Sequence, residues 1–298
     1  MNRRKADAAL AANPIIWGAT FVLVKSALAD VSPVAFLAAR FSLATLALLA
    51  LFQRGWPRSW REVRIGGLIG IFLFAGYLFQ TKGLQFTSAP KSAFITGFAS
   101  VLVPLLGAIV YKTRPQASEM LGICSAIIGL GLMTLEGPLG TINRGDLLTV
   151  VCTFAYAGHI VTLGHYSKEM RFETTSVTQV ATAAFLALAS FWWVEPARLI
   201  WSPAVVFAII ITGLLATALA FTVQAWAQRY TSSTRTALIY MLEPVFAWLT
   251  SYLLVREGLS RRAALGAALI MTGVLLVEVK PLNSKPHPSN SRVSGGAI

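Results

Sequence analysis

The chain has 298 residues, of which 56% are hydrophobic and 12% are charged, and its formal net charge is +13. Soluble globular domains carry about 25% charged residues, so this chain has too few charges to cover a water-facing surface of its size. The composition excludes an ordinary soluble protein and predicts that lipid solvates most of the surface. Nucleic acid is not an expected partner, because a binding footprint would gather the basic residues on one soluble face.

Ten apolar runs follow one another along the chain. Each is close to the ~20 residues that a helix needs to cross ~30 Å of hydrocarbon. The connections between them are short and hold most of the Arg, Lys, Pro and Asp residues. We therefore predict an all-α polytopic membrane protein with ten transmembrane helices in a lipid bilayer. The predicted spans are 8–28, 34–52, 64–83, 92–111, 117–136, 146–165, 176–194, 203–225, 236–255 and 262–279.

The basic residues of the short loops predict the orientation, because cytoplasmic loops carry an excess of Lys and Arg. With a cytoplasmic N-terminus, the inner segments hold 16 Lys and Arg residues and the outer segments hold 7. The last outer loop, VREGLSRR, runs against this bias. We predict a multi-pass protein of the bacterial inner membrane with both termini in the cytoplasm.

A short polar-to-apolar motif occurs twice, as TSAPKSAFI from Thr87 and as TSSTRTALI from Thr231, with an offset of 144 positions. A glutamine precedes both copies at the same distance, as Gln80 and Gln224. Each half of the chain holds five spans, and because five is odd the second half must enter the membrane from the opposite side. Such inverted repeats are typical of secondary transporters, which bind substrate near the midplane between the repeats.

The repeat divides the chain into three parts. We predict a first five-helix repeat at 1–140, a second five-helix repeat at 141–280, and a tail at 281–298. The tail is rich in Pro and Ser and has little to bury, so we expect it to be disordered in the cytoplasm. A monomer is the expected assembly.

Polar and aromatic side chains recur at helical spacing in six of the predicted spans. A single Ser or Thr in such a stripe is explained by helix packing or by a bond to its own backbone. Because the stripes recur in paired spans, we favour a central polar and aromatic cavity. Stripe positions outside the proposed binding set include Asn13, Thr217, Phe221 and Gln228. The candidate substrate-binding residues are Trp17, Phe21, Lys25, Arg40, Tyr77, Gln80, Ser92, Thr96, Tyr156, His159, Gln224, Tyr240, Glu243 and Trp248.

Three basic side chains lie within predicted spans, where a charge costs about 2.5–3.5 kcal/mol on insertion scales. Lys25 is close to the outer end of its span, so snorkelling to the interface is an alternative to a binding role. Arg40 lies deeper and needs a partner, and a structural ion pair is the alternative there. His159 is either a titrating group or a histidine bonded to a neighbouring helix.

Glu243 is the most informative ionisable residue inside a span. Pro244 follows it and removes the amide that would bond to the carbonyl of Tyr240. A loosened turn beside a buried carboxylate is suited to bind a cation or to carry a proton, and a carboxylate tied to the backbone or to Arg40 is the alternative. Pro104 and Pro244 are the candidate hinges.

The fifth and tenth spans lack polar stripes. They carry Gly122 and Gly129 in the first repeat, and Gly266 and Gly273 in the second. Small residues at this kind of spacing let helix backbones approach closely in membranes. We expect these two spans to be closely packed peripheral helices.

No metal, cofactor or enzymatic site is expected. Cys124 and Cys152 fall inside spans, without the spacing of a disulfide framework or a metal site. The histidines at 159, 165 and 287 are scattered, and no pair of acids repeats at ligand spacing. A membrane-embedded enzyme would need a nucleophile, a base or a metal set gathered at one place.

Several stretches resemble the paired EamA-type domains of the drug/metabolite transporter superfamily. They are NPIIWGATFVLVK, ARF at 39–41, LVPLLGAIVYKTRPQASEMLGICSAIIGLGLM and LEPVFAWLTSYLLVREGLSRRAALGAALIMTGVLLV. The resemblance covers nearly the whole chain up to about Lys280, and among ten-span members it is greatest to bacterial amino-acid exporters of the YddG type. The first-half copy departs from the pattern with Thr113 and Arg114, where an acidic residue is usual.

The resemblance and the residues together leave three functions open. The first, which we favour, is export of small zwitterionic metabolites, most of all aromatic or other neutral amino acids, by alternating access. The second is efflux of lipophilic cationic drugs, for which we would expect more acidic side chains lining the central cavity. The third is a membrane enzyme, and transport of a sugar or nucleotide in the same superfamily remains a further possibility.

Overall fold

The computed structural model describes residues 3–53, 55–87, 89–112, 114–134, 142–255 and 260–279. Within these ranges the chain is helical, apart from an isolated β-bridge between Val31 and Leu199. The prediction of an all-α protein is confirmed. The predicted tail at 281–298 and Ser88 of the repeated motif lie outside the described residues.

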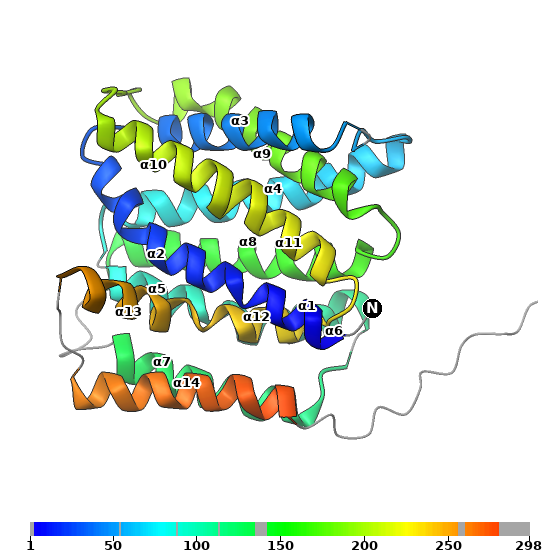
Figure 1. Cartoon of the computed structure of the whole chain (residues 1–298), viewed down its shortest axis with the longest axis vertical. Coiled ribbons are helices and arrows are strands. Elements are labelled where there is room, and N and C mark those ends of the chain that lie inside the picture. The colour runs from blue at the N-terminus through cyan, green and yellow to red at the C-terminus, as the bar shows by residue number, and fades with distance from the viewer. Residues whose placement is uncertain are drawn as a thin grey trace, which may run out of the picture.

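The helices follow the predicted spans closely, with short connections between them (Figure 1). In chain order they are α1 (Arg3–Leu10), α2 (Ala12–Ala27), α3 (Pro33–Leu51), α4 (Trp60–Gly83), α5 (Ala89–Gly97), α6 (Ala99–Tyr111), α7 (Ala117–Thr134), α8 (Arg144–Tyr166), α9 (Phe172–Val194), α10 (Pro203–Gly213), the π-helical turn η1 (Leu214–Leu219), α11 (Ala220–Ala227), α12 (Ser233–Tyr240), α13 (Glu243–Val255) and α14 (Arg261–Val279).

Six helical stretches in the described part of the chain are long and apolar enough to cross a membrane by themselves. The other four predicted spans correspond to α1–α2, α7, α12–α13 and α14, which are shorter, interrupted or less apolar. The six are Pro33–Leu51, Trp60–Gly83, Phe94–Tyr111, Arg144–Tyr166, Phe172–Val194 and Pro203–Ala227.

The fourth and ninth predicted spans are both interrupted, at equivalent places in the two repeats. The break between α5 and α6 lies at Phe98, and the break between α12 and α13 lies at Met241 and Leu242. Phe98 and Leu242 are separated by the same 144 positions as the repeated motif. Pro104 lies inside α6, beyond its break, whereas Pro244 is the second residue of α13.

Helices α7 and α14 pack against each other through glycines at the edge of the molecule (Figure 1). A Cβ atom added to Gly129 would overlap the carbonyl oxygen of Gly266, and one added to Gly273 would overlap that of Gly122. The contact confirms the close packing that was predicted for these spans. Because Gly122 meets Gly273 and Gly129 meets Gly266, the two helices run antiparallel, as equivalent helices of inverted repeats must.

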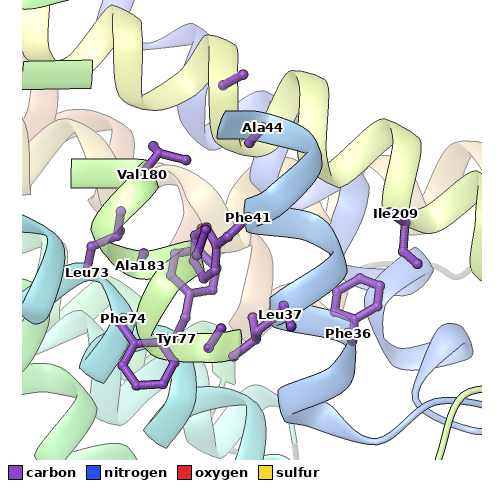
Figure 2. Close-up of a cluster of buried hydrophobic side chains, with 14 of the residues drawn as sticks. Phe36, Leu37, Phe41, Ala44, Leu73, Phe74, Tyr77, Val180, Ala183 and Ile209 are labelled. Carbon is purple, nitrogen blue, oxygen red and sulfur yellow. The ribbon is translucent and has the colours of Figure 1, made fainter. Parts of the chain in front are cut away.

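The largest cluster of buried apolar side chains lies where α3, α4, α9 and α10 meet (Figure 2). Helix α3 is apolar around most of its circumference, which is typical of a helix that is surrounded by others. Phe36 and Phe41 of α3 are fully buried in this cluster, and the ring of Phe41 lies edge-to-face 5.4 Å from that of Tyr77. The cluster therefore fixes α3 and α4 on one side of the site described next.

Candidate functional site

Arg40 lies in α3 with only 4% of its surface exposed. Its Nε donates a hydrogen bond of 2.6 Å to Oγ1 of Thr217, and its Nη2 donates to the Tyr77 hydroxyl at 3.2 Å and to the Ala216 carbonyl at 3.1 Å. The guanidinium carbon also lies 4.6 Å from the centroid of the Tyr77 ring, within cation–π range. All of these partners are neutral, and Arg40 forms no ion pair with any described residue.

The partners of Arg40 come from an irregular helix. Helices α10 and α11 are joined by the π-helical turn η1, and such turns often occur at functional sites. Two side chains of α2 bind carbonyls within this turn and directly after it. Nε1 of Trp17 donates to the carbonyl of Ala216 at 2.9 Å, and Nδ2 of Asn13 donates to that of Ala220 at 2.9 Å. The first and eighth spans are thereby joined at the level of Arg40.

An aromatic cluster surrounds this point, with Phe221 of α11 at its centre. The ring of Phe221 lies 5.8 Å from that of Trp17, 6.1 Å from that of Tyr77 and 5.6 Å from that of His159. Two more tyrosines extend the cluster, since Trp17 lies 4.8 Å from Tyr240, and Tyr77 lies 5.7 Å from Tyr156. Spans one, three, six, eight and nine therefore each contribute a ring to one site.

The polar tips of these rings are bound by side chains of neighbouring helices. The Tyr156 hydroxyl donates to Oε1 of Gln80 at 2.9 Å, and the Tyr240 hydroxyl accepts from Nδ2 of Asn13 at 3.0 Å. Nε2 of His159 lies 2.9 Å from Oε1 of Gln179 in α9. His159 is thus a buried histidine bonded to a neighbouring helix, which is one of the two alternatives that the sequence left open.

Glu243 begins α13, directly after the break in the ninth span. The side chain is partly buried and makes no hydrogen bond or ion pair with the described residues, so the expected alternatives of a bond to Arg40 or to the backbone are not formed. Its backbone carbonyl would lie 3.0 Å from a Cβ atom added to Gly18 of α2, so Glu243 lies beside Trp17 and the aromatic cluster. The site therefore holds one basic and one acidic side chain that are not paired with each other.

The remaining candidates lie beside this centre or away from it. Gln224 bonds to Gln228 at 3.0 Å, and Ser92 lies 3.4 Å from the hydroxyl of Thr149. Thr96 is partly buried in α5. Trp248 stacks on Tyr252, 5.7 Å away, and its buried indole N–H has no partner among the described residues. The side chains of Phe21 and Lys25 lie outside the described part of the structure.

The comparisons with known proteins agree with this architecture. The model of the EamA-like transporter family matches residues 4–135 and again 143–279. The chain belongs to the EamA-like transporter family. A solved crystal structure with 19% sequence identity has the same fold, with a TM-score of 0.77 over 93% of this chain and 98% of the other.

Two relatives illustrate the range of similar proteins. An uncharacterized transporter of Archaeoglobus fulgidus is 35% identical over 280 residues, which are 94% of this chain and 88% of the relative. A protein of Escherichia coli K12 named a probable amino-acid metabolite efflux pump is 26% identical over 281 residues, which are 88% of this chain and 91% of the relative. This EamA-family chain is therefore a membrane transporter.

Proposed function

We propose that this transporter exports small zwitterionic metabolites, in particular neutral or aromatic amino acids, across the bacterial inner membrane. The observation that carries the proposal is the unpaired charge of Arg40 and of Glu243 within one aromatic site. A charge in such a place is costly unless it is paired. The α-carboxylate of an amino acid would pair with Arg40, and its α-ammonium would pair with Glu243.

The rings of Trp17, Tyr77 and Phe221 suit the side chain of such a substrate. Aromatic side chains contribute large apolar areas, and pairs of rings stabilise one another by about 0.5–1.5 kcal/mol beyond that area. Nη1 of Arg40 has no hydrogen-bond partner among the described residues, so it can donate a charge-assisted hydrogen bond that both attracts a carboxylate and orients it. The Escherichia coli relative named a probable amino-acid metabolite efflux pump supports the same substrate class.

Efflux of lipophilic cations is the second candidate, and Glu243 alone favours it. A cation would pair with Glu243 but would leave Arg40 unpaired and would be repelled by it. The two candidates therefore differ in the role of Arg40. Replacing this residue with Gln keeps a side chain that forms hydrogen bonds and removes the charge.

The two interrupted spans support transport by alternating access. The breaks at Phe98 and at Leu242 lie at equivalent positions of the two repeats, so one of them would open each face in turn. Pro104 and Pro244 are the proposed hinge residues of these units. The basic loops support a cytoplasmic location for both termini, and export is the direction that we propose.

The test is a transport panel in proteoliposomes. We expect counterflow of radiolabelled L-phenylalanine or L-leucine, and none of tetraphenylphosphonium. Both Arg40→Gln and Glu243→Gln should raise the half-saturation concentration for the amino acid about tenfold or more, because each removes a charge-assisted contact of about 1.5–3 kcal/mol.

Other outcomes of the panel separate the alternatives. Transport of tetraphenylphosphonium that survives Arg40→Gln would support cation efflux instead. A Glu243→Gln variant that binds normally but no longer responds to a pH gradient would show that Glu243 carries protons. Lower thermal stability with unchanged transport per folded molecule would mean that both charges are structural.

A further inference from the structure

The hydroxyl of Thr217 lies between the guanidinium of Arg40 and a backbone carbonyl. Its Oγ1 donates a hydrogen bond of 2.9 Å to the carbonyl of Thr212, five residues earlier, and accepts the 2.6 Å bond from Nε of Arg40. Thr217 has no exposed surface. Because the hydroxyl proton is directed at Thr212, the oxygen lone pairs are free to face Arg40.

The π-helical turn creates this arrangement. In an α-helix the hydroxyl of Thr bonds back to a carbonyl three or four residues earlier, as Thr222 does with Ala218 at 2.7 Å. In η1 the helix is wider, and the bond from Thr217 spans five residues. The widened turn places Thr217 and the Ala216 carbonyl together against α3.

The close approach of α10 to α3 supports the same geometry. Gly213 directly precedes η1, and a Cβ atom added there would lie 3.1 Å from Cδ2 of Leu43 and 3.2 Å from the carbonyl of Arg40. Even a methyl group here would be in tight contact with α3 and would require a shift of a few tenths of an ångström. Glycine at position 213 therefore allows the eighth span to lie close enough to α3 for Thr217 and the Ala216 carbonyl to accept hydrogen bonds from Arg40.

The acceptors use one side of the arginine fork. Nε and Nη2 are bound by Thr217, Ala216 and Tyr77, whereas Nη1 has no hydrogen-bond partner among the described residues. A guanidinium on an arginine stem has many rotamers, and these three neutral bonds select one of them. Because all three hydrogen-bond acceptors are neutral, they hold the guanidinium without neutralising its positive charge. An aspartate in the same place would neutralise it.

We propose that Thr217, set by the π-helical turn, is the positioning residue that holds Arg40 ready for a substrate carboxylate. This inference rests on the proposed function, in which Arg40 binds the substrate carboxylate. It adds an explanation of how the site comes to prefer anionic groups. The role predicts a loss that depends on the substrate. A change at Thr217 should weaken the binding of ligands that carry a carboxylate and should leave the binding of ligands without one unchanged.

The experiment measures binding to the purified full-length protein with three ligands that share a phenyl ring. L-phenylalanine carries both charges, 3-phenylpropionate carries only the carboxylate, and L-phenylalaninamide carries only the ammonium. The variant Thr217→Val keeps the shape and removes the hydroxyl, and Thr217→Ser keeps the hydroxyl. Thr222→Val is the matched control, because Thr222 bonds only to its own helix.

We expect Thr217→Val to weaken L-phenylalanine and 3-phenylpropionate about tenfold, which corresponds to one hydrogen bond to a charged group. L-phenylalaninamide should change less than twofold, Thr217→Ser should restore binding, and Thr222→Val should resemble the wild type. Equal losses for all three ligands, or no loss for any, would overturn the positioning role.

Failure of the proposed function gives a different pattern. If the wild type binds 3-phenylpropionate but transports no amino acid, the transport proposal fails, and the comparison of Thr217→Val with Thr217→Ser on that ligand still decides the role of Thr217. If the wild type binds neither carboxylate, both proposals are wrong. If only L-phenylalaninamide binds, Arg40 is not a carboxylate site and Thr217 does not position it.

Discussion

Arg235 and Asp7 form a buried ion pair that joins the two repeats. Nη2 of Arg235 lies 3.2 Å from Oδ2 of Asp7, and the two side chains are 6% and 2% exposed. On the opposite face of the molecule, the hydroxyl of Thr87 donates to Oδ1 of Asp146 at 2.7 Å. Each copy of the repeated motif is therefore bound by an acid from the first helix of the other repeat. The motif occurs twice because each face uses one copy.

Removing the charge of Asp7 should destabilise the protein. Breaking a buried ion pair costs about 3–5 kcal/mol, because the remaining buried charge loses its oppositely charged partner. We expect Asp7→Asn to lower the Tm measured in detergent. Glu169→Gln is the control, because the pair of Glu169 with Arg61 is exposed, and such pairs contribute about 0–1 kcal/mol. Equal effects of the two changes would contradict a structural role for Asp7.

The inverted repeat predicts that equivalent loop positions lie on opposite sides of the membrane. Phe86 and Tyr230 directly precede the two motif copies, are 144 positions apart, and are 56% and 38% exposed. In a background with Cys124 and Cys152 changed to Ala, a cysteine at 86 should react with an impermeant maleimide in intact spheroplasts. A cysteine at 230 should react only after lysis. Labelling of both from one side would end the inverted-repeat interpretation.

The contact between α7 and α14 should not tolerate a single methyl group. Gly129→Ala adds a Cβ that overlaps the Gly266 carbonyl, so the helices must separate. Overpacking of this kind costs about 1–3 kcal/mol, and we expect a lower Tm. Gly67→Ala in α4 is the matched control, because nothing lies within 4 Å of its added Cβ. A normal Tm for Gly129→Ala would mean that the two helices are not held together by this contact.

Much of the fold was predictable because it depends on patterns that the bilayer imposes. A span must be apolar over a fixed length, so the ten apolar runs matched the helices to within a few residues. The glycines of α7 and α14 were found for a similar reason, since close helix packing in lipid requires small residues. Aromatic and charged residues within apolar runs were visible for the same reason, and they led to Trp17, Arg40 and Tyr77.

The site could not be predicted in full, because its geometry depends on backbone features that leave no residue pattern. The π-helical turn over Leu214–Leu219 has the same apolar composition as an α-helix, so nothing in the sequence marked the Ala216 carbonyl as an acceptor. Phe221 was visible in a stripe but was not among the candidate binding residues, because helical spacing alone does not show which ring of a stripe lies at the centre of a cluster. Gln179 was missed, although a glutamine in an apolar run was a usable signal.

The two hinge prolines were visible in the sequence, but the positions of the helix breaks near them were not. Each was predicted to bend its helix, but the fourth span breaks at Phe98, ahead of Pro104. A proline lacks the amide that would bond to the carbonyl four residues earlier, which is that of Ser100. The break at Phe98 lies two residues ahead of this carbonyl, so the missing amide of Pro104 does not by itself account for it. In the ninth span Pro244 lies in the first turn of α13, where no amide is needed.

Pro244 should therefore control whether α12 and α13 can join into one helix. Pro244→Ala supplies an amide that reaches the carbonyl of Tyr240 and allows the helix to continue across Met241 and Leu242. A continuous helix would favour one facing state over the other, so we expect slower transport in proteoliposomes from a protein that folds and binds its substrate normally. Pro203→Ala is the control, because Pro203 begins α10 at an uninterrupted helix start. Unchanged turnover of Pro244→Ala at normal expression would show that the break does not gate transport.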